Sequence, residues 1–206
     1  MGDWNSIFKK EGRRYRKPQE DMRSIAALLK KQGVKKVLDL GCGSGRHTVL
    51  LAQKGFEVTG MDNAGYGLQL AKEWLKESGC KARLDNASCY ERFPYRDNYF
   101  DAIISVQVIH HGRIKDIRFC IAEIYRVLKP GGIIFITMGN ERKRIGMNRD
   151  RVKMIAPRTF VVTEGHEEGV THFILNKDII KREFKDFSIQ DIHSDSKDNY
   201  CVLAKK

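Results

Sequence analysis

The chain has 206 residues, of which 41% are hydrophobic and 31% charged; this suits one domain with a full hydrophobic core and excludes a disordered chain. No apolar run approaches the roughly 18 residues of a membrane helix, the N-terminus lacks a signal-peptide core, and the five cysteines form no C-x-x-C pair, so we expect a cytoplasmic protein without a membrane partner. The net charge of +12, from 38 Lys and Arg against 26 Asp and Glu, favours an anionic partner.

Helix-like and strand-like segments alternate along the chain. Helical spacing of apolar residues, closed by glycines, predicts helices over 18–33, 46–54, 68–78, 114–128 and 177–185. Short apolar or β-branched runs predict strands at 37–40, 56–62, 81–85, 101–110, 133–138, 187–193 and 199–205. Such alternation is typical of a parallel α/β sheet, and the short turn between the last two strands requires one of them to run antiparallel.

Two segments do not fit this alternation, and both are basic. Residues 9–17 hold six basic residues and one acidic residue, and residues 140–158 hold seven and two. The rest of the chain has 25 basic and 23 acidic residues, so it is nearly neutral. We therefore expect a basic N-terminal arm at 1–17 and a polar, irregular insert at 139–175, both near the carboxyl ends of the strands.

The stretch VLDLGCGSG, at 37–45, is the most informative in the sequence. A strand that ends in a Gly-rich turn before a helix is a nucleotide-binding geometry, because glycine lets the backbone approach a ligand closely. The dinucleotide fingerprint requires glycine at position 46, where this chain has Arg46. Asp39 would repel a pyrophosphate but suits a ligand with a cationic amino group. S-adenosylmethionine (SAM) combines adenosine with such a group.

Acidic residues also end the next two predicted strands. Asp62 lies 21 residues after Gly41, where nucleotide-binding α/β folds place the acid that binds the ribose hydroxyls. Asp85 could accept a hydrogen bond from an adenine amino group. A single aspartate at a strand end is most often solvated or caps a helix. Three acids beside a Gly-rich loop instead favour a ligand crevice that they line together.

These motifs resemble those of class I SAM-dependent methyltransferases, of the methyltransferase type 11 kind. FPYRDNYFDAIIS (93–105) and YRVLKPGGIIFIT (125–137) are similar to the family's blocks around strands four and five. The resemblance implies one domain over 1–206, with a Rossmann-like, doubly wound sheet of seven strands, mostly parallel with an antiparallel C-terminal hairpin. It also implies SAM as cofactor and S-adenosylhomocysteine as product.

Carried over from the family, the cofactor-binding residues fall into four groups. Asp39 and Gly41, with Gly43 and Gly45 of the same loop, would hold the methionine end, and Asp62 with Asn63 the ribose. Asp85 and the Asn86 backbone would bind adenine, although the following spacer is longer than usual and Ser88 is an alternative to Asp85. Gln107 would lie near the cofactor.

The methyl acceptor is less well marked. The resemblance places the acceptor site after the fourth strand of the sheet, where His110 and His111 lie. Either histidine could act as a base or form a hydrogen bond with a loop carbonyl. VIHHGRIKDIRFCIAEIYRVLKPGG (108–132) is similar to a block of tRNA wobble-uridine carboxymethyl methyltransferases. The exocyclic-amine motif [DNS]-P-P-[YF] and the Pro-Cys nucleophile of cytosine-C5 enzymes are absent from the sequence.

Two further segments could contribute to the acceptor site. GHEEGVTHF, at 165–173, places His166, Glu167, Glu168 and His172 close together, which fits a polar lid loop better than a metal or acid–base pair. No ligand set has metal spacing, so no metal is expected. Trp4, Ile7 and Phe8 could form a lid or a packed arm.

Three functions fit these observations. The first is methyl transfer to a small acceptor, which the charge suggests is anionic. The second is the same reaction on tRNA or another RNA, and the third is SAM binding without catalysis. We favour the small acceptor because no RNA-binding domain or array of stacking aromatics accompanies the charge. The expected assembly is a monomer or a homodimer.

Overall fold

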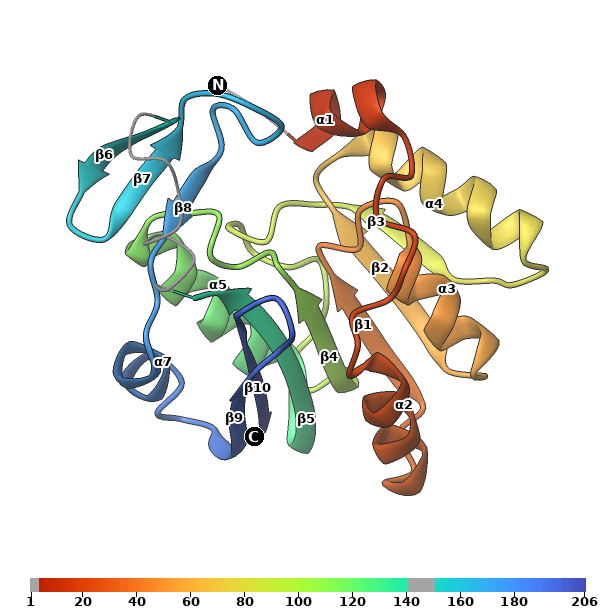
Figure 1. The fold of residues 1–206 in the computed structure, drawn as a ribbon. Coiled ribbons are helices and arrows are strands. Elements are labelled where there is room, and N and C mark those ends of the chain that lie inside the picture. Colours follow the sequence, from red (N-terminus) through yellow and green to blue (C-terminus); the bar gives the residue numbers. More distant parts are fainter. Residues whose placement is uncertain (1–3, 141–150) are drawn as a thin grey trace.

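The computed structural model describes residues 4–140 and 151–206, and its centre is a seven-stranded sheet (Figure 1). The strand order is β3-β2-β1-β4-β5-β10-β9. The bounds are β1 Lys36–Leu40, β2 Glu57–Asp62, β3 Arg83–Asn86, β4 Phe100–Val106, β5 Leu128–Gly139, β9 Ser188–Ser194 and β10 Asn199–Lys205. β1 to β5 run parallel, and β10 pairs antiparallel with both β5 and β9. The predicted fold class is confirmed.

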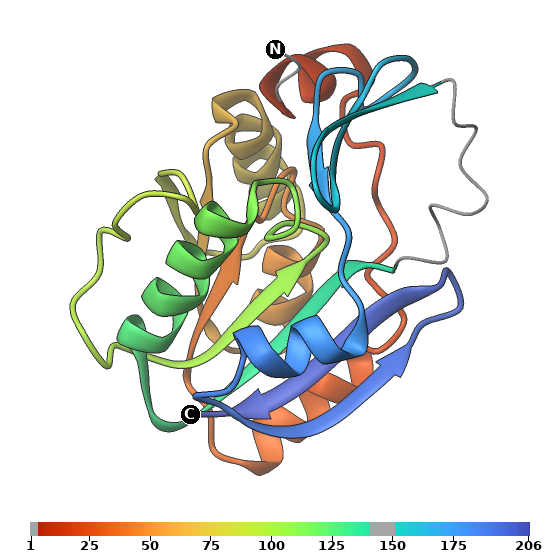
Figure 2. The ribbon, with the colours of Figure 1, turned by 90° about the vertical axis from the view of Figure 1, so that its left-hand side faces the viewer.

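Helices cover both faces of this sheet. α2 (Met22–Lys31), α3 (Arg46–Gln53) and α4 (Gly65–Glu77) lie on one face, and α5 (Ile114–Val127) and α7 (Lys177–Glu183) lie on the other, as the second view makes plain (Figure 2). Each face has its own apolar cluster. Leu29 and Leu51 pack with Phe135 on the first, whereas Ile124 and Phe184 pack on the second. None of the helices in the described ranges is long and apolar enough to cross a membrane.

The strand order reverses between β1 and β4. β1 is followed by β2 on one side and lies against β4 on the other, so the loops after β1 and β4 diverge. In open α/β sheets, a crevice at such a switch point, at the carboxyl ends of the strands, is the usual ligand site. The loop after β1 holds Gly41 to Gly45, and the turn after β4 holds Gln107 to Gly112.

Two segments have more regular structure than their sequences predict. The N-terminal arm contains α1 (Trp4–Glu11). The insert contains a three-stranded antiparallel sheet of β6 (Val152–Ala156), β7 (Thr159–Val162) and β8 (Thr171–Phe173), so the expectation of an irregular segment at 139–175 is wrong there. Both elements lie above the carboxyl ends of the central strands (Figure 1). Arg142, Lys143, Arg144 and Arg149 of the basic insert lie outside the described residues.

The fourth strand ends at Val106, four residues before its predicted end at His110. Gln107 has φ 60°, a left-handed conformation that a strand cannot continue through. Its backbone N–H and side-chain amide both contact Thr137 of β5, and these bonds fix the bend. The apolar VQVIH sequence therefore predicts a longer strand than the structure has, and His110 and His111 lie in the turn after the strand.

Candidate active site

A cavity of about 770 Å³ lies at this switch point. It is lined by the Gly41–Ser44 loop, by Asp62 and Asn63 at the end of β2, and by the turn after β4 with Gln107, His110 and His111. α1, residues 15–20, β8 and residues 195–199 form further parts of its walls. This volume is within the range of about 300–1,000 Å³ found for small-molecule and cofactor sites. The cavity thus joins the two regions that the sequence assigns to cofactor and acceptor.

The glycines of the β1–α3 loop are required by close packing. Gly41 and Gly43 have φ values of 71° and 52°, and a Cβ at either position would lie less than 3 Å from Val108 or Phe8, respectively. A side chain here would also fill the space where a ligand can reach the backbone. The loop therefore forms a smooth cradle that fits the expected cofactor.

Asp62 fixes the shape of this cradle. One carboxylate oxygen accepts a hydrogen bond from the Gly43 backbone N–H at 2.8 Å, and the other accepts one from the Ala64 N–H at 2.8 Å. Burial raises the pKa of Asp62, while these backbone donors oppose the shift. The carboxylate lines the cavity and holds the glycine loop against the end of β2.

Asp39 and Gly45 support the loop from behind and are not among the cavity-lining residues. Asp39 is 1% exposed, and it accepts a hydrogen bond from the Thr48 hydroxyl at 2.6 Å. Burial raises its pKa to about 6. Its place beneath the loop suits a role in shaping the cradle, and direct contact with the cofactor stays a prediction.

Asp85 and Asn86 also lie outside the cavity lining. Asp85 accepts hydrogen bonds from the Tyr95 hydroxyl and from Arg83, both at 2.9 Å. Ser88, the alternative, accepts one from the Tyr90 N–H. A role in adenine binding for any of these residues therefore stays a prediction.

Three histidines meet at the other end of the cavity. The ring centroids of His110 and His111 are 4.2 Å apart, and the ring of His172, from β8, lies 5.6 Å and 4.7 Å from them. Burial, with the neighbouring His110 and His172, lowers the pKa of His111 well below 6.5. At neutral pH this imidazole is therefore uncharged.

The segment before β8 adds an acid to these histidines. Glu167 Oε2 lies 3.1 Å from Nε2 of His172. Burial favours the protonated carboxyl, but His172, His111 and His166 outweigh it and lower the pKa of Glu167 to about 2. His166 contacts the Tyr15 hydroxyl at 2.6 Å and Glu11 at 3.2 Å, which ties the insert to the N-terminal arm.

α1 covers the cavity from the glycine loop to His111. Phe8 is buried and packs on Gly43 and Gly67, while Asn5 accepts a hydrogen bond from the Tyr66 N–H at 2.8 Å in the first turn of α4. Trp4 lies over His111 with ring centroids 5.2 Å apart. The arm is therefore a packed helix that also lines the cavity.

Residues 37–132 match the protein family described as methyltransferase domain. A solved SAM-dependent methyltransferase from Clostridium acetobutylicum superimposes with a TM-score of 0.75, at 17% identity over 97% of this chain and 96% of that one. Residues 37–132 thus match a methyltransferase domain, and the chain shares the fold of this methyltransferase.

The curated relatives that the chain matches in part are methyltransferases of different kinds. A probable tRNA methyltransferase 9B from Homo sapiens is 38% identical over 102 residues, which are 48% of this chain and 20% of that protein. A ubiquinone biosynthesis O-methyltransferase from Pseudomonas aeruginosa is 30% identical over 110 residues, which are 53% of this chain and 47% of that protein. The matches thus span less than half the length of these relatives.

The candidate site contains residues that the sequence did not bring together. His172 lies in the insert, and the sequence around it carries no pattern that predicts its contact with His110 and His111. His47 of α3 lines the same cavity and accepts a hydrogen bond from the Gln19 N–H at 3.1 Å. These contacts depend on how the insert and α2 fold onto the sheet, which no local pattern encodes.

Proposed function

We propose that this protein transfers a methyl group from SAM to a small anionic acceptor held in the cavity between the glycine loop and the three histidines. The observation that carries the proposal is the continuity of this cavity from Asp62 at one end to His111 at the other. A site for direct transfer has to place both reactants in one space.

The cavity residues divide the work. When bound, SAM supplies a methyl group carried on a sulfonium sulfur. Gly41, Gly43 and Asp62 hold the cofactor, and α1 covers it and excludes water. His111 lines the acceptor side of the cavity and accepts the proton that the acceptor atom loses, and His110 and His172 position that acceptor.

The cavity offers three basic side chains to an anionic acceptor. Lys17, Arg46 and Lys197 line it together with four carboxylates, those of Glu20, Asp62, Glu167 and Asp195. The carboxylates of Asp62 and Glu167 have partners within the protein, backbone N–H groups for Asp62 and His172 for Glu167. A carboxylate or phosphate of the acceptor would therefore bind at the basic side chains.

RNA is the second candidate. The similarity to a probable tRNA methyltransferase and the basic arm favour it. Part of the arm's charge is paired within the protein, however, since Arg13 contacts Glu77 and Glu73. α1 and the β6–β8 sheet also close over the cavity, which suits a small acceptor better than a nucleotide within a strand.

Turnover of the His110→Gln and His111→Gln variants tests the proposed roles. Loss of a general base lowers the rate by about 10²–10⁴-fold. We expect this loss in His111→Gln, a smaller loss in His110→Gln, and S-adenosylhomocysteine affinity unchanged in both, as measured by calorimetry. Wild-type turnover in both variants would contradict a role for these histidines, and SAM binding without turnover in any extract fraction would point to a non-catalytic binding module.

A further inference from the structure

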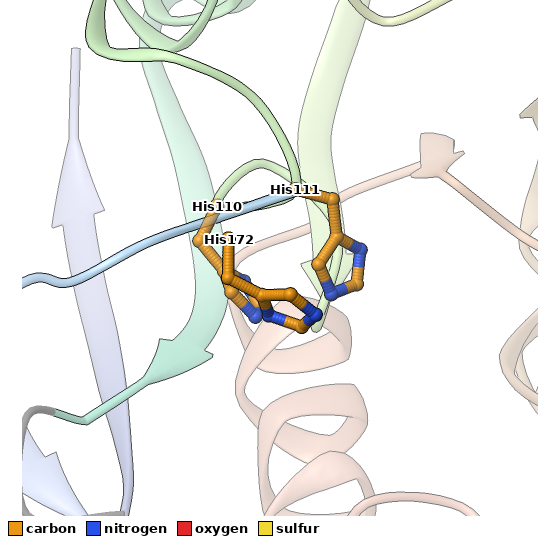
Figure 3. A group of neighbouring side chains, drawn as sticks. All are labelled: His110, His111 and His172. Carbon is orange, nitrogen blue, oxygen red and sulfur yellow. The ribbon is translucent and has the colours of Figure 1, made fainter. Parts of the chain in front are cut away.

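The three histidines are close enough to share one ligand. One ring nitrogen from each of His110, His111 and His172 lies within 4.8 Å of those from the other two. Figure 3 shows the two side chains of the β4 turn and the one from β8 pointing into the same space. His110 is 4% exposed and His172 8%, so this is a largely buried cluster of polar rings.

Neighbouring contacts hold this cluster in place. The Phe173 backbone N–H donates to the His110 carbonyl at 2.8 Å, which fixes β8 against the turn after β4. Phe160 stacks on the ring of His172, with centroids 5.1 Å apart and planes 6° from parallel, and Trp4 covers His111. The rings are therefore held together by the fold before any ligand arrives.

Glu167 completes the arrangement. Its carboxylate lies 3.1 Å from Nε2 of His172, at the edge of the cluster. If Nδ1 of His172 binds an ion, a small turn of the ring lets its Nε2–H donate to Glu167. A carboxylate bonded to the second nitrogen of a histidine is the usual support of metal-binding imidazoles, because it fixes the ring and raises its basicity.

We propose that His110, His111 and His172 bind a divalent transition-metal ion of the zinc class, and that the carboxylate of Glu167 supports the ring of His172. Three imidazoles suit zinc, and three protein ligands leave one tetrahedral position open. All four residues line the cavity, so an ion that they hold would lie at its wall. This set combines His110 and His111 with residues of the insert, which neither segment's own sequence spacing indicates.

The geometry requires only a small closure. Three nitrogens at most 4.8 Å apart lie no more than about 2.8 Å from a common centre. A Zn–N bond of about 2.1 Å then requires each ring to move inward by less than about 1 Å. Such a shift is within the reach of a side-chain rotation.

The part that the ion plays in catalysis rests on the proposed function, whereas its binding does not. A hydroxyl oxygen or thiol sulfur of the acceptor would occupy the open position and lose its proton to solvent as it coordinates. Its lone pair then attacks the methyl carbon while the carbon–sulfur bond breaks toward sulfur. With the ion present, His111 acts as a ligand, and the charge of the ion takes over the work of a base.

Metal titration of the tag-free chain, stripped with a chelator, tests the site directly. We expect one Zn²⁺ or Co²⁺ per chain by calorimetry, and a tetrahedral Co²⁺ absorption without a thiolate charge-transfer band. His172→Ala and His111→Ala should each weaken binding at least 100-fold, since even second-shell changes cost about 10–100-fold. His193→Ala is the matched control, because His193 lies near Asp21 and Cys201 in the other described group of metal-ligand type.

The results separate this proposal from the proposed function. Equal Zn²⁺ affinity in both cluster variants, loss of binding in His193→Ala, or a thiolate band would overturn the site. If one cluster variant is unfolded by circular dichroism, the other decides. S-adenosylhomocysteine affinity is measured on the same samples: its absence in the wild-type chain would contradict the proposed function and leave the metal result standing.

Discussion

Asp62 has two roles, because it shapes the glycine loop and also lines the cavity. Its two oxygens accept backbone hydrogen bonds on either side of the β2 end. Charged hydrogen bonds of this kind are stronger than neutral ones, so loss of the carboxylate releases the loop as well as any ligand.

Asp62→Ala should therefore weaken S-adenosylhomocysteine binding at least tenfold, about 1.4 kcal/mol. Isothermal titration measures the change, with Asp186→Ala as the control because Asp186 is exposed and distant from the cavity lining. An unchanged affinity in Asp62→Ala would remove this residue from the cofactor site. Gly43→Val should also block binding, since its side chain meets Phe8.

Asp39 predicts a pH dependence of folding. Its folded pKa, raised by burial to about 6, exceeds the unfolded value, so its contribution to stability is fully present below about pH 4 and is lost as pH rises through 6. The expected loss is on the order of 3 kcal/mol. Denaturant unfolding at a series of pH values should show this decline in the wild type and a flatter profile in Asp39→Asn. Parallel profiles would contradict the assignment.

Residue roles were predictable where they follow from spacing along adjacent strands. Asp62 and the glycine loop lie in one crevice because parallel strands bring their carboxyl ends to one edge. His172 could not be paired with His110, because their contact depends on β8 docking beside the β4 turn. Asp85 illustrates the opposite limit: spacing placed it at a strand end, but its carboxylate bonds Tyr95 and Arg83.

At the scale of elements, α1 and the β6–β8 sheet determine how the cavity is covered. Both lie in segments whose sequences suggested a basic arm and an irregular insert. α1 has eight residues and is too short to be stable alone, so its order depends on Phe8 and Asn5 docking on α4. The sequence could not indicate this, because the partner surface is formed by the GCGSG loop and Gly67.

Phe8→Ala should undock α1. A buried phenylalanine contributes about 3–5 kcal/mol to packing, more than a terminal helix of two turns can replace. We expect faster tryptic cleavage after the basic residues that follow α1, at 13–17, and weaker S-adenosylhomocysteine binding. Lys10→Ala, an exposed change in the same helix, is the control. Unchanged cleavage in Phe8→Ala would contradict the covering role of α1.

At the scale of the whole molecule, the central strands and helices followed from the sequence because apolar periodicity is local and strong there. β10 begins and ends where predicted, and α5 begins at Ile114 as expected. The net positive charge is concentrated in the arm and the insert, outside the nearly neutral central fold. Within the described part of the arm, Arg13 and Arg14 form ion pairs with acidic residues of the same protein.

This distribution predicts weak RNA binding. Phosphate contacts give an affinity that falls steeply with salt, by about 10³–10⁵-fold for six to ten contacts between low and moderate ionic strength. We expect only non-specific binding of a structured RNA, lost at physiological salt in a filter-binding or anisotropy assay. Micromolar or tighter binding that persists there would favour the RNA acceptor.

Methyl-labelled SAM, incubated with the purified chain and a fractionated cell extract, provides the most direct test of the central claim. We predict that label enters a small, anionic metabolite, and that the Asp62→Ala variant transfers none. Label in RNA would contradict the proposed acceptor. The absence of label from every fraction, despite bound SAM, would contradict the proposal that this protein is a catalyst.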